Sequence, residues 1–176
     1  MLMAAESFRE QVEKGLGAVV IFAGSGSDEA HIDKIVNGIR KYGLPVEVRV
    51  KSAHKQSEEL LRAMQEYDNL CGPLVYIAVA GGTDALSGTI SYNSLRPTIS
   101  CPPDHINMSG LTNPLGSSNA YIGRPENAAR FIAQMFSGIN PYCRVILFRE
   151  ITEKRAALEN DDKRLQNKYS GEGVLT

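Results

Sequence analysis

Glycines, hydroxyl-bearing residues and one histidine–lysine pair gather in three short clusters along this chain, and a fourth cluster consists of cysteine and proline. The clusters are Gly24–Asp28 (GSGSD), Ser52–Lys55 (SAHK), Gly81–Gly88 (GGTDALSG) and Cys101–Pro103 (CPP). Glycine lets a backbone approach a ligand closely, free N–H and O–H groups donate to phosphate oxygens, and histidine transfers protons near neutral pH. Together the clusters predict a site that binds a phosphorylated, nucleotide-like small molecule and can move a proton.

The first cluster, GSGSD, precedes a stretch with helical periodicity, where the first turn of a helix would offer free N–H groups to an anion. Ser25 and Ser27 add hydroxyl donors for phosphate oxygens. A turn with a helix cap, in which Asp28 stabilises the helix dipole, is an alternative that this segment alone leaves open. Glu29 stands where the third glycine of a dinucleotide fingerprint would be, and no Walker lysine follows, which disfavours nicotinamide cofactors and ATP.

The second cluster, SAHK, carries the most specific chemistry. His54 can transfer protons near neutral pH, and Lys55 offers a point charge for a phosphate. A lone histidine in a loop is more often structural than catalytic. A histidine–lysine pair opposite a glycine-rich anion loop favours the catalytic interpretation.

The third and fourth clusters would form the rest of the site. In GGTDALSG, Gly81 and Gly82 allow close approach of a ligand to the backbone, ahead of an expected helix. A βα turn in which Thr83 or Asp84 caps that helix is the alternative for this segment. The CPP cluster is rigid and poor in donors, so we expect it to shape a wall.

Each cluster directly follows a short apolar or β-branched run with the length of a strand. The predicted strands are 18–23, 46–50, 74–80, 98–101 and 120–123, and their spacing is typical of βαβ units. Amphipathic stretches at 28–42, 57–70 and 126–138 predict helices, the first with Ile32, Ile35, Val36 and Ile39 on one face, the second with Leu60, Leu61, Met64 and Tyr67. Because the carboxyl ends of parallel strands share one edge of a sheet, we expect the four clusters to converge there.

The pattern predicts one domain over residues 1–176, a three-layer α/β/α sandwich with a parallel, flavodoxin-like sheet. Its core would span about 18–140, and an extra helical extension would span about 142–169. That extension begins apolar and becomes strongly charged. Packing on a neighbouring subunit and closing one edge of the same sheet are both open interpretations.

Composition limits the partners and the compartment. The formal net charge of -1 gives no broad reason to expect nucleic acid or an anionic membrane. Five charged residues between positions 6 and 14 leave no apolar core for a signal peptide, and no run is long enough to span a membrane. The three cysteines are far apart and form no CxxC pair, so we expect reduced thiols, no zinc site and a cytoplasmic location.

The motifs GSGSD, SAHK, AGGTDALSG and ISCPP resemble, in order, those of the 5-aminoimidazole ribonucleotide carboxylases of purine biosynthesis, over about Val19 to Phe136. SAHK with ISCPP is similar to class II, which uses CO2, whereas class I mutases typically read SAHR and carry a GGAAHLPG loop. The resemblance implies a flavodoxin-like homo-octamer. It also implies a reaction that joins CO2 to carbon 4 of the imidazole ring without metal, biotin or ATP.

The resemblance implies a role for three of the clusters. Ser25 and Asp28 would contact the ribotide phosphate or ribose, Ser52 and Lys55 would hold the substrate, and His54 would lie beside the imidazole. Backbone from the third cluster would pass close to the ring and the CO2. The expected site is catalytic His54 with substrate-binding Ser25, Ser27, Asp28, Ser52, Lys55, Gly81, Gly82, Thr83 and Asp84.

Three positions depart from the pattern of class II, which commonly reads GRSNALSG and SSLRxPSG. Gly82 and Thr112 stand in place of arginines, and Asp84 stands in place of an asparagine, where its charge would oppose a carboxylate-forming centre unless protonated. The connection after CPP is also shortened by several residues. A non-catalytic or altered-specificity ribotide-binding homologue therefore stays open beside a carboxylase. A mutase acting on the carboxyamino isomer is a further alternative, which Lys55 and the missing HLPG loop disfavour.

Overall fold

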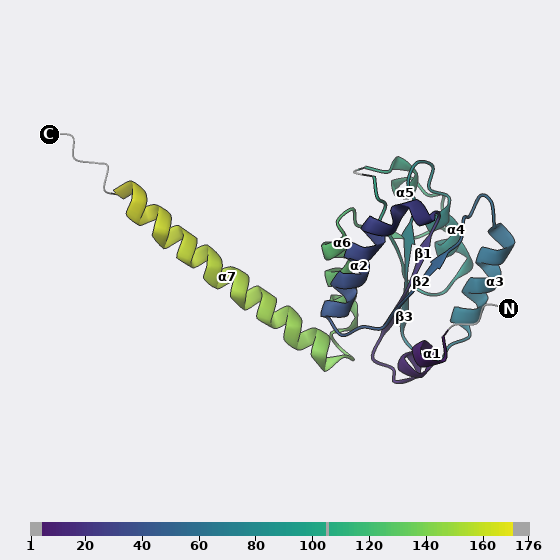
Figure 1. Ribbon diagram of the computed structural model, residues 1–176, viewed down its shortest axis with the longest axis horizontal. Coiled ribbons are helices and arrows are strands. Elements are labelled where there is room, and N and C mark those ends of the chain that lie inside the picture. Colours follow the sequence, from purple (N-terminus) through teal and green to yellow (C-terminus); the bar gives the residue numbers. More distant parts are fainter. Residues whose placement is uncertain (1–4, 105, 171–176) are drawn as a thin grey trace.

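A five-stranded parallel sheet lies between two layers of helices in the computed structural model of the chain, which describes residues 5–104 and 106–170 (Figure 1). The strands are β1 (Ala18–Ala23), β2 (Val46–Val50), β3 (Leu74–Val79), β4 (Thr98–Ser100) and β5 (Ala120–Tyr121). Their order across the sheet is β2-β1-β3-β4-β5, and every neighbouring pair is parallel. This is the flavodoxin-like order, so the predicted sandwich is confirmed.

The helices divide between the two faces of the sheet. In chain order they are α1 (Glu6–Glu13), the 3-10 turn η1 (Gly26–Asp28), α2 (Glu29–Lys41), α3 (Ser57–Asp68), α4 (Leu86–Asn93), α5 (Met108–Leu111), α6 (Pro125–Phe136) and α7 (Pro141–Ser170). Helices α2 and α6 and the first turns of α7 pack on one face, and α1, α3 and α4 pack on the other (Figure 1).

The two central strands explain why the sheet needs both layers. In β1, Val19, Ile21 and Ala23 belong to the core under α2 and α6, while Ala18, Val20 and Phe22 belong to the core under α3. Strand β3 alternates in the same way and is also buried along its whole length. Successive side chains of a strand point to opposite faces, so a strand that is apolar throughout must be covered on both sides.

Some details of the helices differ from the sequence expectation. Leu61 of α3 is 40% exposed, and Ala63 is buried instead, because the buried face of this helix recurs at spacings of three and four residues, at Leu60, Ala63, Met64 and Tyr67. Helix α1 is an element beyond the three helices predicted from amphipathic stretches, and it covers the α3 side of the core with Phe8 and Val12.

Helix α7 is a single helix of 30 residues that leaves the domain and projects from it (Figure 1). Its start is fixed, since Oδ1 of the buried Asn140 accepts from N–H of Tyr142 and Cys143. Cys143, Ile146 and Leu147 then join the core under α2 and α6, whereas every residue from 151 to 170 is exposed. The first turns therefore close over the parent domain, and the remaining turns have no partner within the described residues. No helix in residues 5–104 and 106–170 is both long and apolar enough for a membrane span.

Candidate functional site

The carboxyl ends of β1, β2 and β3 surround a cavity of about 290 Å³. Its lining residues are Gly24, Ser25, Ser27, Asp28, Ser52, Ala53, His54, Lys55, Ala80, Gly81, Thr83, Ala85 and Leu86. Three of the four sequence clusters thus meet at one cavity, at the sheet edge where parallel sheets bind ligands.

The wall that follows β1 is built around two serines. Ser25 is extended and caps η1, and its Oγ accepts from the N–H of Ser27 at 3.1 Å and lies 2.8 Å from the Ser27 hydroxyl. Asp28 begins α2 but makes no side-chain capping bond. The capping interpretation of this cluster therefore holds for Ser25, while the Asp28 side chain lies at the cavity. The result is a loop with exposed hydroxyls at the start of a helix, a suitable place for a phosphate or ribose.

The wall that follows β2 carries the titratable groups. The Ser52 carbonyl accepts from the N–H of Gln56 at 2.8 Å, which closes the SAHK segment into a turn. Ala53 packs on the core under α3, and His54 and Lys55 are exposed at the cavity. Within the described part of the chain, Lys55 is the only lysine or arginine that lines this cavity.

The loop after β3 differs from the expectation at Gly82. Gly81 and Thr83 line the cavity, but Gly82 does not. Gly82 has φ +65° and donates its N–H to Oδ2 of Asp104 at 2.7 Å, on another loop. Its amide is thus already bonded away from the cavity, and its backbone conformation favours glycine over any other residue.

Asp84 has a different place from the one expected. It is 3% exposed, does not line the cavity, and its Oδ1 accepts from the N–H groups of Leu86 and Ser87 at 2.8 and 3.0 Å. Its Oδ2 accepts from the hydroxyls of Ser87 and Ser100 at 2.7 and 3.2 Å. Four donors stabilise the buried carboxylate. Asp84 therefore belongs to the helix-cap alternative, and its charge faces the start of α4 instead of a bound substrate.

The CPP cluster lies behind the site and does not line it. A side chain on Gly81 would meet Cγ of Pro103 at 3.3 Å and the carboxylate oxygens of Asp104 at 3.2 Å. Burial raises the pKa of the Cys101 thiol to about 12, so this thiol stays protonated and is not a nucleophile. The Cys101 carbonyl lies 3.0 Å from Nε2 of His31, a half-buried residue of α2.

Two further sequence positions have defined places. Thr112 ends the short helix α5, where its hydroxyl donates to the Met108 carbonyl at 2.7 Å, and it does not line the cavity. No cluster of three or more His, Cys, Asp or Glu side chains suited to a metal ion occurs in residues 5–104 and 106–170.

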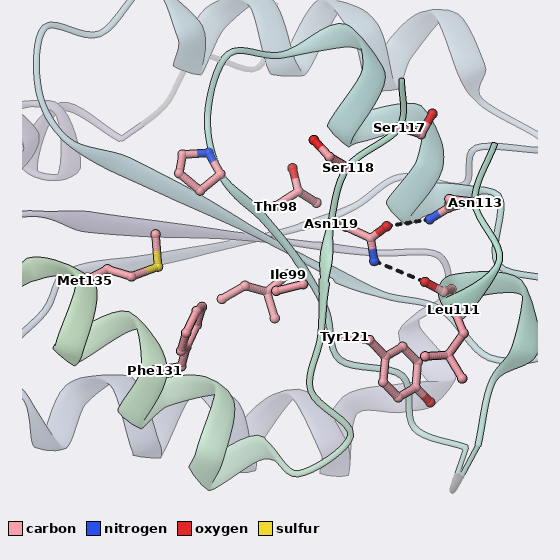
Figure 2. Close-up of a pocket in the computed structure, with 13 residues that line it drawn as sticks. Thr98, Ile99, Leu111, Asn113, Ser117, Ser118, Asn119, Tyr121, Phe131 and Met135 are labelled. Atoms are coloured by element: carbon pink, nitrogen blue, oxygen red, sulfur yellow. Dashed lines mark hydrogen bonds between the residues drawn. The ribbon is translucent and has the colours of Figure 1, made fainter. Parts of the chain in front are cut away.

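A second, larger cavity of about 560 Å³ lies beside β4, β5 and α6 (Figure 2). Phe131 and Met135 of α6 approach Ile99 on one side of it, and Asn119 lies on the other, bonded to Asn113 at 2.7 Å and to the Gly110 carbonyl at 3.1 Å. Among the residues that the structure describes, its lining holds no charged side chain and none of the four clusters. The smaller cavity is therefore the candidate site.

A sequence profile described as AIR carboxylase matches residues 18–157, which include all five strands and the first half of α7. The chain belongs to the AIR carboxylase family. The family prediction made from the motifs is thereby confirmed.

Similar proteins include both short and long relatives. A phosphoribosylaminoimidazole carboxylase from Treponema denticola is 37% identical over 68% of this chain and 79% of its own length, and one from Archaeoglobus fulgidus is 31% identical over 87% of each. A bifunctional phosphoribosylaminoimidazole carboxylase/succinocarboxamide synthetase from Drosophila melanogaster is 40% identical over 73% of this chain, which matches 31% of that longer protein. The chain spans about a third of the length of such bifunctional relatives.

The fold agrees with that of a solved family member. The crystal structure of Treponema denticola PurE matches 85% of this chain and 99% of that chain with a TM-score of 0.79 and 31% identity. This AIR carboxylase family member therefore has the flavodoxin-like fold of its relatives, and its four clusters occur on the corresponding fold.

Proposed function

We propose that this chain is a phosphoribosylaminoimidazole carboxylase, which joins CO2 to carbon 4 of 5-aminoimidazole ribonucleotide in purine biosynthesis. The observation that carries the proposal is the 290 Å³ cavity, where the serine loop after β1, His54 and Lys55 lie together. Family membership supports the same reaction. We assign it to the cytoplasm, in keeping with the three free cysteines.

The proposed roles follow from the chemistry of the lining. Ser25, Ser27 and Lys55 bind the phosphate, and Asp28 accepts from the ribose hydroxyls. The imidazole ring lies beside His54. The amino group makes carbon 4 of the ring electron-rich, so the carbon–carbon bond to CO2 forms by direct attack and the proton on carbon 4 must then leave. His54 accepts that proton, while the protein orients the ring and excludes water.

No metal, biotin or ATP takes part in the proposed reaction, because the ring is already nucleophilic and CO2 needs no prior activation. The reaction is balanced by one proton transferred to His54. Turnover is therefore expected to survive EDTA and avidin. Loss of activity with EDTA that a divalent ion restores would contradict this part of the proposal.

A second candidate function is ribotide binding without turnover. Lys55 as the single lysine or arginine among the described lining residues favours it, because a ribotide phosphate carries up to two negative charges. Purified chain mixed with the ribotide and bicarbonate, followed by product absorbance, separates the two. Product formation supports the carboxylase. Saturable ribotide binding by calorimetry without product supports the binding protein, and turnover of the carboxyamino isomer alone indicates a mutase.

We further propose that the chain works as a homo-oligomer, an octamer by family resemblance. The unpartnered part of α7 supports this, because Ile151, Leu158 and Leu165 recur every seven residues along its exposed length. Light scattering on the full chain gives its mass in solution. A monomer at micromolar concentration would contradict the proposal.

A further inference from the structure

The loop Ala80–Thr83 forms one wall of the proposed site, and little side-chain packing fixes its conformation. It joins β3 to α4, and Gly82 within it has φ +65°. A side chain on Gly82 would meet nothing within 4 Å, so packing does not fix this position. The carbonyls and amides of the loop must find partners elsewhere.

Asn107 supplies partners for two of the carbonyls. It is 2% exposed, and its Nδ2 donates to the carbonyls of Gly82 at 3.0 Å and Ala80 at 3.3 Å. Its Oδ1 accepts from the N–H groups of Ser109 and Gly110 at 3.1 and 3.4 Å, which caps α5. The side-chain amide thus joins the loop after β3 to the start of α5.

Two further hydrogen bonds fix the position of Asn107 relative to the loop. The backbone N–H of Asn107 donates to the Tyr121 hydroxyl at 2.9 Å, which ties it to β5. Oδ2 of Asp104 accepts from the Gly82 N–H at 2.7 Å and lies 3.4 Å from Nδ2 of Asn107. Gly82 is therefore bonded through both its N–H and its carbonyl, by two side chains from one segment.

We propose that Asp104 and Asn107 are positioning residues, which hold the Ala80–Thr83 loop so that Gly81 and Thr83 face the bound ring and CO2. The kinetic part of this inference rests on the proposed carboxylase function; the effect on the loop does not. The backbone that contacts the ring and CO2 must be positioned accurately, because small displacements at a reacting centre lower the rate by large factors.

The first test replaces Asn107 with aspartate. Asn107→Asp keeps the oxygen that caps α5 but turns a second oxygen toward the carbonyls of Ala80 and Gly82, where no donor remains. We expect kcat/KM for the ribotide to fall by roughly tenfold or more, mainly through kcat. The Gly82 amide should exchange with solvent at least about tenfold faster, measured by NMR, because its bond to Asp104 depends on the position of the loop.

The matched control is Asn119→Asp. Asn119 is a half-buried asparagine in the neighbouring loop, and its Nδ2 donates to the Gly110 carbonyl at 3.1 Å. Unlike Asn107, it makes no hydrogen bond to Ala80–Thr83. It should change kcat/KM and the exchange rate of the Gly82 amide by less than about threefold. Equal effects of Asn107→Asp and Asn119→Asp would overturn the assignment of Asn107.

Substitutions of Asp104 test the same hydrogen bonds to the Ala80–Thr83 loop without disturbing the core, because Asp104 is exposed. Asp104→Ala removes the acceptor for Gly82 N–H and should accelerate exchange of that amide and lower kcat/KM by roughly tenfold, whereas Asp104→Asn keeps an acceptor and should restore most of both. This pair decides the matter if Asn107→Asp does not fold. Wild-type exchange at Gly82 in Asp104→Ala overturns the proposal. A wild-type chain without turnover would refute the carboxylase function. The exchange rate of the Gly82 amide would still test whether Asp104 and Asn107 hold the loop.

Discussion

The Ser87 hydroxyl donates a hydrogen bond of 2.7 Å to Oδ2 of the buried Asp84, and it also accepts from Nδ2 of Asn113 at 3.0 Å. This chain of bonds joins the first turn of α4 to the loop that follows α5. With Ser100 as a further donor, it places Asp84 at a junction of β4, α4 and that loop. An aspartate that the sequence suggests for substrate binding therefore stabilises the fold.

Asp84→Ala should lower the free energy of unfolding by about 3 kcal/mol, because it leaves buried N–H and O–H donors without an acceptor. Asp84→Asn should lose less, since the amide oxygen still accepts and the serine hydroxyls can rotate. Urea denaturation measures both. Asp33→Ala on the exposed face of α2 is the control and should change stability by no more than about 0.5 kcal/mol. Wild-type stability in Asp84→Ala would refute the role of this network.

Glu150 fixes α7 to the domain in a pH-dependent way. Its carboxylate accepts from the Tyr42 hydroxyl at 2.8 Å and pairs with Lys41 and Arg130. Partial burial acts to raise its pKa, but the hydrogen bonds from Lys41 and Tyr42 and the charges of Lys41 and Arg130 outweigh it and lower the pKa of Glu150. Burial also raises the pKa of Tyr42, so the phenol stays a donor.

A lowered folded-state pKa means that Glu150 contributes stability above its unfolded pKa and loses it as the pH falls through the folded value. Glu150→Gln should therefore cost about 1–2 kcal/mol near neutral pH and progressively less below about pH 4. Thermal unfolding across this pH range measures the difference. Glu159→Gln, which breaks an exposed pair with Lys163, should show no such trend. A pH-independent cost for Glu150→Gln would contradict the account.

Lys55 should dominate phosphate binding. A charge-assisted hydrogen bond contributes about 1.5–3 kcal/mol, so Lys55→Ala should raise the Kd for the ribotide roughly ten- to a hundredfold. Wild-type affinity should also weaken as salt rises, because an exposed lysine is screened. Calorimetric titration at low and high salt measures both, with Lys34→Ala on α2 as the control. An unchanged Kd would mean that another cation, such as one from a neighbouring subunit, binds the phosphate.

The strands and their shared edge were predictable because apolar runs and the glycine-rich turns after them are local patterns. What local patterns could not give was the direction of a polar side chain. Asp84 could cap a helix or face a ligand, and Ser100, on a separate strand, decides between them. Asp104 and Asn107 lie in an irregular loop, where no periodicity marks a residue that bonds to Gly82. The contact between Nε2 of His31 and the Cys101 carbonyl likewise joins residues 70 positions apart, which no local pattern predicts.

In the proposed reaction the cavity is a catalytic site in which His54 accepts the ring proton. The most direct test is kcat of His54→Asn with the ribotide and bicarbonate, beside calorimetric ribotide binding and a folding measurement on the same protein. We expect kcat to fall at least about a hundredfold while the Kd and the unfolding transition stay close to wild type, since His54 is exposed at the cavity and general acid–base catalysis contributes factors of this size. His31→Asn, on α2, should retain activity within a few-fold. A well-folded His54→Asn protein that keeps most of its turnover would remove His54 from the mechanism and contradict the account.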